Sequence, residues 1–223
     1  MKTIKLYDLS HTMAKELLEN YEYPWESLGA LREFTAKLVS ELSEDDGYYL
    51  LYEGVVAAKS AVISKSATIY APAVIGENTE IRCGAFIRGS VIIGDGCVVG
   101  NSCEIKNSVL FDRVQVPHFN YVGDSILGYR SHLGAGAITS NVKSDKSPVT
   151  VKGDGVTIET GLKKFGAMIG DGVEIGCNSV LNPGCIIGKN TAIYPLSSVR
   201  GVIPPDSIFK SKDNVVKRNI KGE

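Results

Sequence analysis

The stretch ISKSATIYAPAVIGENTEIRCGAFIRGSVIIGDGCVVGNSCEIKNSVLF, residues 63–111, carries an apolar residue at every sixth position. If about 40% of positions were apolar at random, nine such positions in one phase would arise in roughly three of ten thousand trials. The nine positions are Ile63, Ile69, Ile75, Ile81, Ile87, Ile93, Val99, Ile105 and Phe111. The period of six is therefore a property of the structure and not of the composition.

The same phase returns later in the chain and is accompanied by a second pattern. Apolar residues continue at Ile169, Ile175, Leu181, Ile187, Ile193 and Val199, and a shorter run covers Tyr121, Leu127 and Leu133. Four positions after each apolar residue stands a small or β-branched one, such as Ala67, Ala73 or Cys97. A sixfold period of this kind is typical of a parallel β-helix, whose short strands turn at every sixth residue.

The first 55 residues do not follow the sixfold phase. Ser10 is suited to cap a helix over roughly 11–20, Pro24 is suited to begin a second helix, and Tyr48–Tyr52 has the composition of a strand. We expect a small helical cap over 1–55, a β-helix over 56–205 and a C-terminal tail over 206–223. Because the first coil leaves unpaired backbone groups at its edge, we expect the cap to pack on that open N-terminal edge.

The repeat is interrupted between Phe111 and Tyr121 and again between Ser140 and Ile169. Loops carry binding and catalytic residues more often than the scaffold that holds them. These two interruptions are therefore where we expect the chemistry of the protein.

Residues 104–141 contain three motifs that together resemble a known family. The first is E-x-K at 104–106, the second is H-x-x-Y-x-G-D at 118–124, and the third is LGAGAITSN at 133–141. They are similar to motifs of the acetyltransferase domain of bifunctional UDP-N-acetylglucosamine pyrophosphorylase/glucosamine-1-phosphate acetyltransferases, within the hexapeptide-repeat acyltransferase superfamily. The resemblance covers roughly residues 60–200 and implies an all-β fold, a left-handed parallel β-helix.

The resemblance implies roles for five residues. His118 takes the position of the catalytic base, and a histidine suits this role because its unperturbed pKa of about 6.5 lets it accept a proton near neutrality. Arg88 and Lys106 match residues that hold the phosphate of the sugar, and both side chains are suited to a phosphate group. Tyr121 and Asn141 match residues that contact the sugar.

The resemblance also implies a co-substrate and an assembly. Acetyl-CoA is expected to lie along the outside of the coils, where Ala135, Thr160 and Cys177 correspond to contacts of the family. The family implies a homotrimer with each site between subunits, and closed cyclic symmetry is the usual outcome for homo-oligomers. We expect no metal site, because acetyl transfer requires no metal.

Two departures from the family affect the acceptor pocket. His132 stands where the family has asparagine, and residues 142–144, Val-Lys-Ser, stand where it has Tyr-Asp-Gly. We include His132 among the expected substrate-binding residues. Because the base is kept while these positions differ, acetyl transfer is better supported than glucosamine 1-phosphate as the acceptor.

We therefore expect an N-acetyltransferase that moves acetyl from acetyl-CoA to an amino sugar, either an amino-sugar phosphate or a nucleotide sugar. The alternatives are an O-acetyltransferase and a non-catalytic regulatory or scaffolding protein that keeps the fold without the chemistry. The repeat begins near residue 57, so we expect no nucleotidyltransferase domain, which would need a Rossmann-like sheet and a Gly-rich loop.

The composition sets the remaining expectations. A formal net charge of -1 and a pI near 6.3 give no basic footprint for nucleic acid. The N-terminus lacks a continuous apolar segment, and no stretch of 18 apolar residues occurs. We expect a cytoplasmic protein that binds neither nucleic acid nor membranes.

Overall fold

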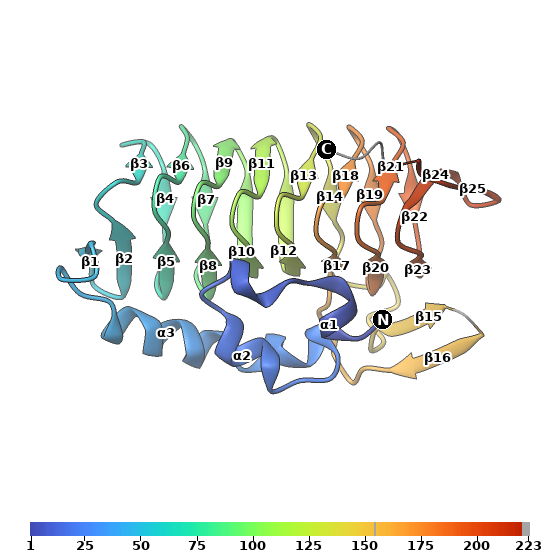
Figure 1. Cartoon of the computed structure of the whole chain (residues 1–223), viewed down its shortest axis with the longest axis horizontal. Helices are drawn as coiled ribbons and strands as arrows, with labels where there is room; N and C mark the ends of the chain where they lie inside the picture. Colours follow the sequence, from blue (N-terminus) through green and yellow to red (C-terminus); the bar gives the residue numbers. More distant parts are fainter. Residues whose placement is uncertain (154, 220–223) are drawn as a thin grey trace.

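The computed structural model describes residues 1–153 and 155–219, and most of the chain forms a left-handed parallel β-helix (Figure 1). Each coil contributes to three ladders of parallel strands, which we name the first, second and third faces. The first face contains β2 (Val55–Ala58), β5 (Ala73–Ile75), β8 (Val91–Ile93), β17 (Ala167–Ile169), β20 (Cys185–Ile187) and β23 (Val202–Ile203), together with the second halves of β10 (Glu104–Leu110) and β12 (Tyr121–Leu127).

The other two faces are built in the same way. The second face contains β3 (Val62–Ile63), β6 (Glu80–Ile81), β9 (Val98–Asn101), β11 (Gln115–His118), β13 (His132–Leu133), β18 (Glu174–Ile175), β21 (Ala192–Ile193) and β24 (Ser207–Ser211). The third contains β4 (Thr68–Ile69), β7 (Phe86–Ile87), the first halves of β10 and β12, β14 (Ile138–Thr139), β19 (Val180–Leu181) and β22 (Ser198–Val199). The sixfold period predicted this architecture, and the structure confirms it.

The residues of the repeat fill the interior of the coils. Ile75 pairs with Ile93 one coil later, and Ile87 pairs with Ile105 in the same way. All four side chains are fully buried. Each such ladder removes aliphatic surface from water along the whole coil, which stabilises the fold by about 25 cal/mol per Å².

The sixfold phase of the apolar residues shifts at an earlier point in the chain than the sequence indicated. Ile93 pairs with Leu110, and Ile105 pairs with Val122, so these residues stand 17 positions apart. The prediction that Phe111 and Tyr121 occupy the repeated apolar position is therefore wrong. The coil is one residue shorter within β10 and again within β12. Both strands run through the corner between the third and first faces without a break.

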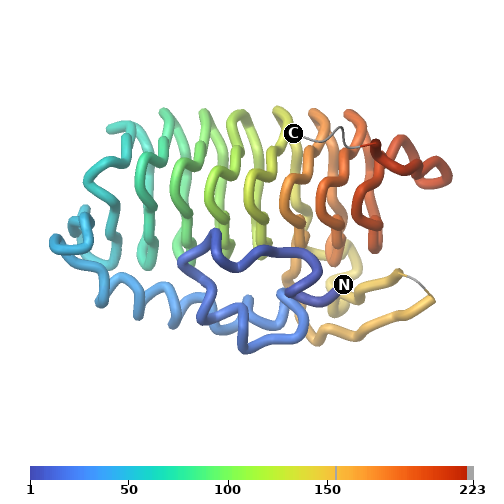
Figure 2. The backbone as a smooth tube through the Cα atoms, in the orientation of Figure 1, coloured from blue at the N-terminus to red at the C-terminus, as the bar shows by residue number. Residues whose placement is uncertain are grey.

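We expected the N-terminal helices to cap the open edge of the first coil. They lie instead along the side of the first face. They comprise α1 (Thr3–Leu6), α2 (Lys15–Glu19), α3 (Leu31–Glu41) and the 3-10 helices η1 (Leu9–His11) and η2 (Pro24–Gly29). Figures 1 and 2 show this blue segment running beside several successive coils. The open edge of β2 is instead paired by the antiparallel strand β1 (Tyr48–Tyr52).

An apolar stripe on the first face explains this placement. Strand residues alternate between the interior and the outside, yet the outward residues of the first face are aliphatic too. They are Val56, Val74, Ile92, Val109, Ile126, Met168 and Ile186, and all are buried. The helical segment lies on this stripe, with α3 against β5, β8 and β10 and the Tyr7 hydroxyl donating to Ile126 O. Aromatic contacts beside the stripe, Tyr7 on Phe111 and Trp25 on Phe165, add to this packing.

Two hairpins complete the chain. The second interruption contains β15 (Thr150–Gly153) and β16 (Val156–Glu159), an antiparallel pair beside the N-terminal segment (Figure 1). Past the expected boundary at 205, β24 still pairs with β21, and β25 (Asn214–Lys217) folds back on it. The expected tail is thus a hairpin over its described part, and residues 220–223 lie outside the described residues. Within 1–153 and 155–219, no helix has the length and apolarity needed to cross a membrane.

Candidate active site

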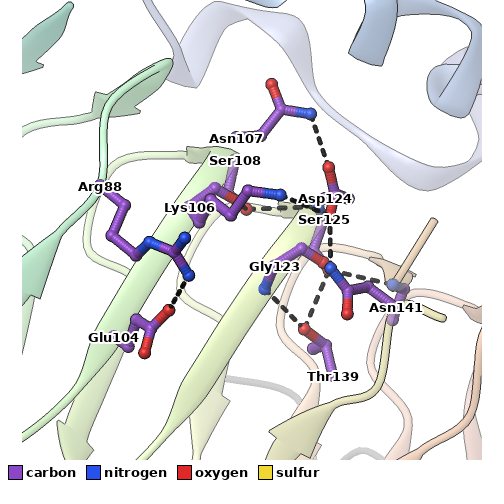
Figure 3. A network of polar contacts seen from close by, with 11 residues as sticks. Arg88, Glu104, Lys106, Asn107, Ser108, Gly123, Asp124, Ser125, Thr139 and Asn141 are labelled. Carbon is purple, nitrogen blue, oxygen red and sulfur yellow. Dashed lines mark hydrogen bonds and ion pairs between the residues drawn. The ribbon is translucent and has the colours of Figure 1, made fainter. Parts of the chain in front are cut away.

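Four of the predicted substrate-binding residues lie near the corner between the third and first faces, where the coils are one residue shorter. Arg88 follows β7, Lys106 lies in β10, Tyr121 begins β12, and Asn141 follows β14. Lys106 pairs with Gly123 in the neighbouring coil, so parallel stacking places these side chains at the same corner. Figure 3 shows Lys106 and Asn141 directed toward Asp124, and Arg88 beside them directed toward Glu104.

Asp124 stands at the centre of this cluster. Its side chain is nearly buried, and its two carboxylate oxygens accept hydrogen bonds from Asn107 Nδ2 at 2.8 Å and from Asn141 Nδ2 at 2.5 Å. Lys106 Nζ lies 3.4 Å from Asp124 Oδ2. A buried carboxylate is costly unless it is paired and hydrogen-bonded, so the three donors and Asp124 hold each other in place (Figure 3).

A second carboxylate orients Arg88. Its Nη1 lies 2.6 Å from Glu104 Oε1, one coil away, and both side chains are partly exposed. A guanidinium has five N–H donors and an ammonium has three. Arg88 and Lys106 therefore keep donors for a ligand although each is already paired with a carboxylate.

The phenol of Tyr121 lies over Gly123. A Cβ on Gly123 would collide with the Tyr121 hydroxyl, so glycine is what lets the ring fold back onto the strand. Burial raises the pKa of Tyr121, and the charges of Asp124 and Glu104 raise it further, whereas a hydrogen bond with Asn141 and the charge of Arg88 oppose the shift. The phenol remains a neutral hydroxyl that can donate or accept a hydrogen bond.

His118 lies at the opposite edge of the third face, at the corner between the second and third faces. It ends β11, and Tyr121 begins β12 three residues later. The imidazole is exposed, and apart from a ring contact with exposed Phe119 it has no hydrogen bond or ion pair within the described part of the chain. The residues from Tyr121 to Asp124 span about 10 Å of strand, which separates the histidine corner from the Asp124 corner.

Two of the three predicted CoA-binding residues share the corner of His118. Backbone hydrogen bonds run from Gly136 N to His118 O at 3.0 Å and from Asn178 N to Ala135 O at 2.8 Å. These bonds stack His118, Ala135 and Cys177 in successive coils, and Cys177 is exposed.

The remaining two predicted residues lie elsewhere. Thr160 follows the β15–β16 hairpin, where its hydroxyl and its amide both donate to Val149 O. His132 lies in the middle of the second face, with Nδ1 2.8 Å from Glu174 Oε2. Within one chain the structure does not bring Thr160 or His132 to the Asp124 cluster.

Sequence reasoning left out Glu104, Asn107 and Asp124, although Glu104 and Asp124 stand within the motifs that it singled out. Glu104 stands two residues before Lys106 in the E-x-K motif, so a carboxylate near a cation was visible there, whereas Asp124 has no basic neighbour in sequence and finds its partners in adjacent coils. In the described part of the chain, no group of three or more His, Cys, Asp or Glu side chains is arranged to hold a metal ion.

Comparisons with known proteins agree with this architecture. Residues 70–163 match the GMPPB C-terminal domain, and residues 166–201 match the bacterial transferase hexapeptide (six repeats). The bifunctional protein GlmU of Methanococcus maripaludis is 44% identical in strain C7 and 37% identical in strain S2, over 88% of this chain and 49% of either relative. The chain spans half or less of the length of the curated relatives it matches.

Among solved structures, the N-acyltransferase AntD from Bacillus cereus, in complex with dTDP and 3-hydroxybutyryl-CoA, is 20% identical with a TM-score of 0.40. That alignment covers 73% of this chain and 83% of AntD. The family matches and the curated relatives carry the assignment. The chain belongs to the hexapeptide-repeat acyltransferase superfamily, and its repeats are similar to those of bifunctional GlmU proteins.

Proposed function

We propose that the protein transfers an acetyl group from acetyl-CoA to the amino group of a sugar that carries a phosphate or a nucleotide. The observation that carries the proposal is the cluster around Asp124, where Arg88, Lys106, Tyr121 and Asn141 meet at one corner of the coil. Two cations, a neutral hydroxyl and an amide suit a polar ligand with an anionic group.

The proposed base is His118. An imidazole that makes no hydrogen bond with any described residue can take a proton from a substrate. As the amine nitrogen attacks the thioester carbonyl, the C–N bond forms and His118 accepts the proton that the nitrogen loses. The C–S bond then breaks, and the departing thiolate of CoA takes that proton from the imidazolium, which restores the base and yields the amide.

The proposed position of acetyl-CoA follows from the stacking of Ala135 and Cys177 with His118. A pantetheine arm along this corner would bring its thioester beside the imidazole, where a backbone amide could stabilise the developing oxyanion. Thr160 joins this site only if the β15–β16 hairpin faces the cofactor. The reaction uses proton transfer and backbone donors, so we propose that it needs no metal.

We further propose a homotrimer with the acetyl-transfer sites between subunits. In one chain the N-terminal segment covers the first face, whereas the second and third faces carry His132 and the Asp124 cluster. A neighbouring subunit whose second face met the third face would bring His132 toward the acceptor. A sedimentation measurement that gave a monomer would contradict this assembly.

The test is the release of CoA thiol from acetyl-CoA over a panel of amino sugars, their 1-phosphates and nucleotide amino sugars. We expect release with at least one phosphorylated amino sugar, insensitivity to EDTA and strong loss in His118→Ala. Matched sugars without an amino group test O-acetylation. Absence of release with every acceptor, together with absence of acetyl-CoA binding by calorimetry, would favour a scaffolding role and contradict the proposal.

A further inference from the structure

A cavity of about 370 Å³ lies between the second interruption of the repeat and the last coils. Its lining comes from that interruption and from the turns that lead from the third face to the first. The described lining residues, none of which stands in a strand of the second or third face, are Lys143, Thr150, Lys152, Pro183, Arg200 and Gly201. The cavity therefore lies outside the two faces that the proposed trimer brings together.

Strand β15 is seated closely on this corner of the coil (Figure 1). Gly184 and Gly201 have φ values of +79° and +76°. A Cβ on Gly184 would meet Thr150 O at 2.9 Å, and a Cβ on Gly201 would meet Lys152 O at 2.6 Å. Because glycine has no Cβ, the strand can approach the turns at both positions. This contact holds Lys152 beside Arg200, the residue before Gly201.

Two of the three cations that line the cavity have no ion-pair partner. Lys152 and Arg200 are exposed, and neither side chain makes a hydrogen bond or an ion pair with any residue of 1–153 or 155–219. Lys143 Nζ, in contrast, lies 3.7 Å from Asp145 Oδ2 and donates to Ser147 Oγ at 2.5 Å. A guanidinium and an ammonium are thus left for a ligand, and both groups are suited to phosphate oxygens.

The polar groups around the cavity do not neutralise these two cations. Glu159 pairs with Thr150 across the hairpin, but it is exposed and does not line the cavity. Among the described lining residues there is no carboxylate, and the Thr150 hydroxyl adds a further donor. The cavity therefore favours an anion.

A phosphate of the acceptor held by Lys106 lies too far away to fill this cavity. Parallel pairing leads from Lys106 to Gly123 and Ser140, and then through Asn182 to Arg200. The path takes four coil steps of about 4.8 Å each, so the two cations stand about 19 Å apart along the corner. One phosphate group cannot contact both.

The donor has the reach that the acceptor phosphate lacks. Backbone hydrogen bonds lead from His118 through the coils of Ala135 and Cys177 to Leu196, in the coil of Arg200. Three coil steps of about 4.8 Å, and about 10 Å across the third face, place the cavity about 17 Å from His118. An extended pantetheine arm with its thioester spans roughly 16 Å, at the reach per bond of an extended chain. A thioester beside His118 therefore places the phosphates of CoA at the cavity.

We propose that Lys152 and Arg200 form a binding site for the phosphate groups of acetyl-CoA. The assignment rests on the proposed function, since it takes acetyl-CoA as the donor. In this arrangement the β15–β16 hairpin faces the cofactor, as a contact with Thr160 requires. The two interruptions of the repeat then have different tasks, because the first supplies the base and the second holds the nucleotide end of the cofactor.

Calorimetric titration with adenosine 3′,5′-bisphosphate tests the site without acetyl transfer, because this probe has the phosphates of CoA and no thioester. We expect the wild type to bind it, and to bind adenosine, which has no phosphate, about tenfold more weakly or less. UDP is the third probe, since it carries the phosphates of a nucleotide-sugar acceptor.

The decisive variant is Lys152→Gln/Arg200→Gln, which removes both charges and keeps two polar side chains at exposed positions. We expect binding of adenosine 3′,5′-bisphosphate to weaken about tenfold or more, and the KM for acetyl-CoA to rise by a similar factor at unchanged kcat. The KM for acetyl-pantetheine, which lacks the phosphates, and the titration with UDP should match those of the wild type.

Arg32→Gln/Lys65→Gln is the matched control. It also removes one arginine and one lysine, and both residues are exposed, in α3 and in the turn between β3 and β4. Its affinity for adenosine 3′,5′-bisphosphate should equal that of the wild type, which separates a local contact from a general effect of net charge.

Four outcomes would overturn the proposal. The wild type does not bind adenosine 3′,5′-bisphosphate more tightly than adenosine; the variant at 152 and 200 binds the bisphosphate as the wild type does; that variant loses UDP instead, which assigns the cavity to the acceptor; or it melts several degrees below the control, which assigns the two cations to folding. Failure of the proposed function looks different, because the bisphosphate titrations then follow our expectation while no acceptor releases thiol.

Discussion

The two corners that flank the third face are built in opposite ways. At the Asp124 corner, each polar side chain has a partner, and the carboxylate itself is only 4% exposed. At the His118 corner, the imidazole is exposed, and among the described residues it has no hydrogen bond or ion pair, with only the 62% exposed Phe119 ring beside it.

This difference separates two demands of the proposed reaction. A group that holds a ligand benefits from being fixed in advance, since less freedom is lost on binding. A group that accepts a proton must reach the reacting nitrogen and keep its lone pair unoccupied. Substitutions at the two corners should therefore affect different kinetic constants.

The largest effect is expected from His118→Ala. Removal of a general base lowers kcat by about 10²- to 10⁴-fold, whereas an exposed side chain without polar partners adds little to stability. Thiol release under saturating substrates measures the first effect, and a thermal melt measures the second. His118→Asn, which keeps polarity without basicity, should be equally impaired. Full activity in either variant would remove His118 from the mechanism.

The next effect is expected from Asp124→Asn. The substitution leaves Lys106, Asn107 and Asn141 without their shared carboxylate, which should cost about 1–3 kcal/mol of the free energy of unfolding. The acceptor KM should rise more than kcat falls, because the cluster holds substrate and does not take the proton. Asp145→Asn, at an exposed carboxylate, is the control. A pure kcat defect in Asp124→Asn would contradict the division between the corners.

A smaller effect is expected from Gly123→Ala. The added Cβ would displace the Tyr121 ring, and a displacement of this size should raise the acceptor KM about tenfold with little change in kcat. Gly29→Ala is the control, because a Cβ there meets no atom within 4 Å. Equal KM values for the two variants would show that the ring position does not matter.

The smallest effect is expected at alkaline pH. Burial raises the pKa of Tyr121, and it raises the pKa of Tyr48, Cys97 and Cys185 to about 12. A pKa that is higher in the folded state gives stability that is present below the unfolded pKa and is lost as pH rises through the folded value. The urea midpoint should therefore be level from pH 7 to 8 and fall above pH 9. Tyr121→Phe should fall less steeply, and a midpoint that rises at pH 11 would contradict this account.

The coil could be predicted because its period is physically strict. An inward side chain must be aliphatic in every coil, so Ile75, Ile87 and Ile93 mark the phase without any structure. The shortened corners could not be located, because Val109, Leu110 and Phe111 are all apolar and any of them fits the sixfold phase. Only strand register shows that Leu110 pairs with Ile93.

The expected position of the helical segment was wrong, although the sequence contains a signal for the true position. Adjacent aliphatic pairs such as Val74-Ile75 and Ile92-Ile93 place one side chain inside and the other outside, which marks a face that needs a cover. The role of Asp124 was harder to see, since its partners come from the coil before it and the coil after it. His118, Ala135 and Cys177 were predicted as site residues, and the structure adds that they share one corner.

The central claim is that the Asp124 corner holds the acceptor sugar and that His118, at the other corner, accepts the proton of its amine. The most direct test is calorimetric binding of the phosphorylated amino sugar to His118→Ala, measured beside thiol release from acetyl-CoA by the same preparation. The account predicts that binding changes by less than twofold while thiol release falls at least a hundredfold, as loss of a general base implies. Loss of acceptor binding in this variant, or thiol release near the wild-type rate, would contradict it.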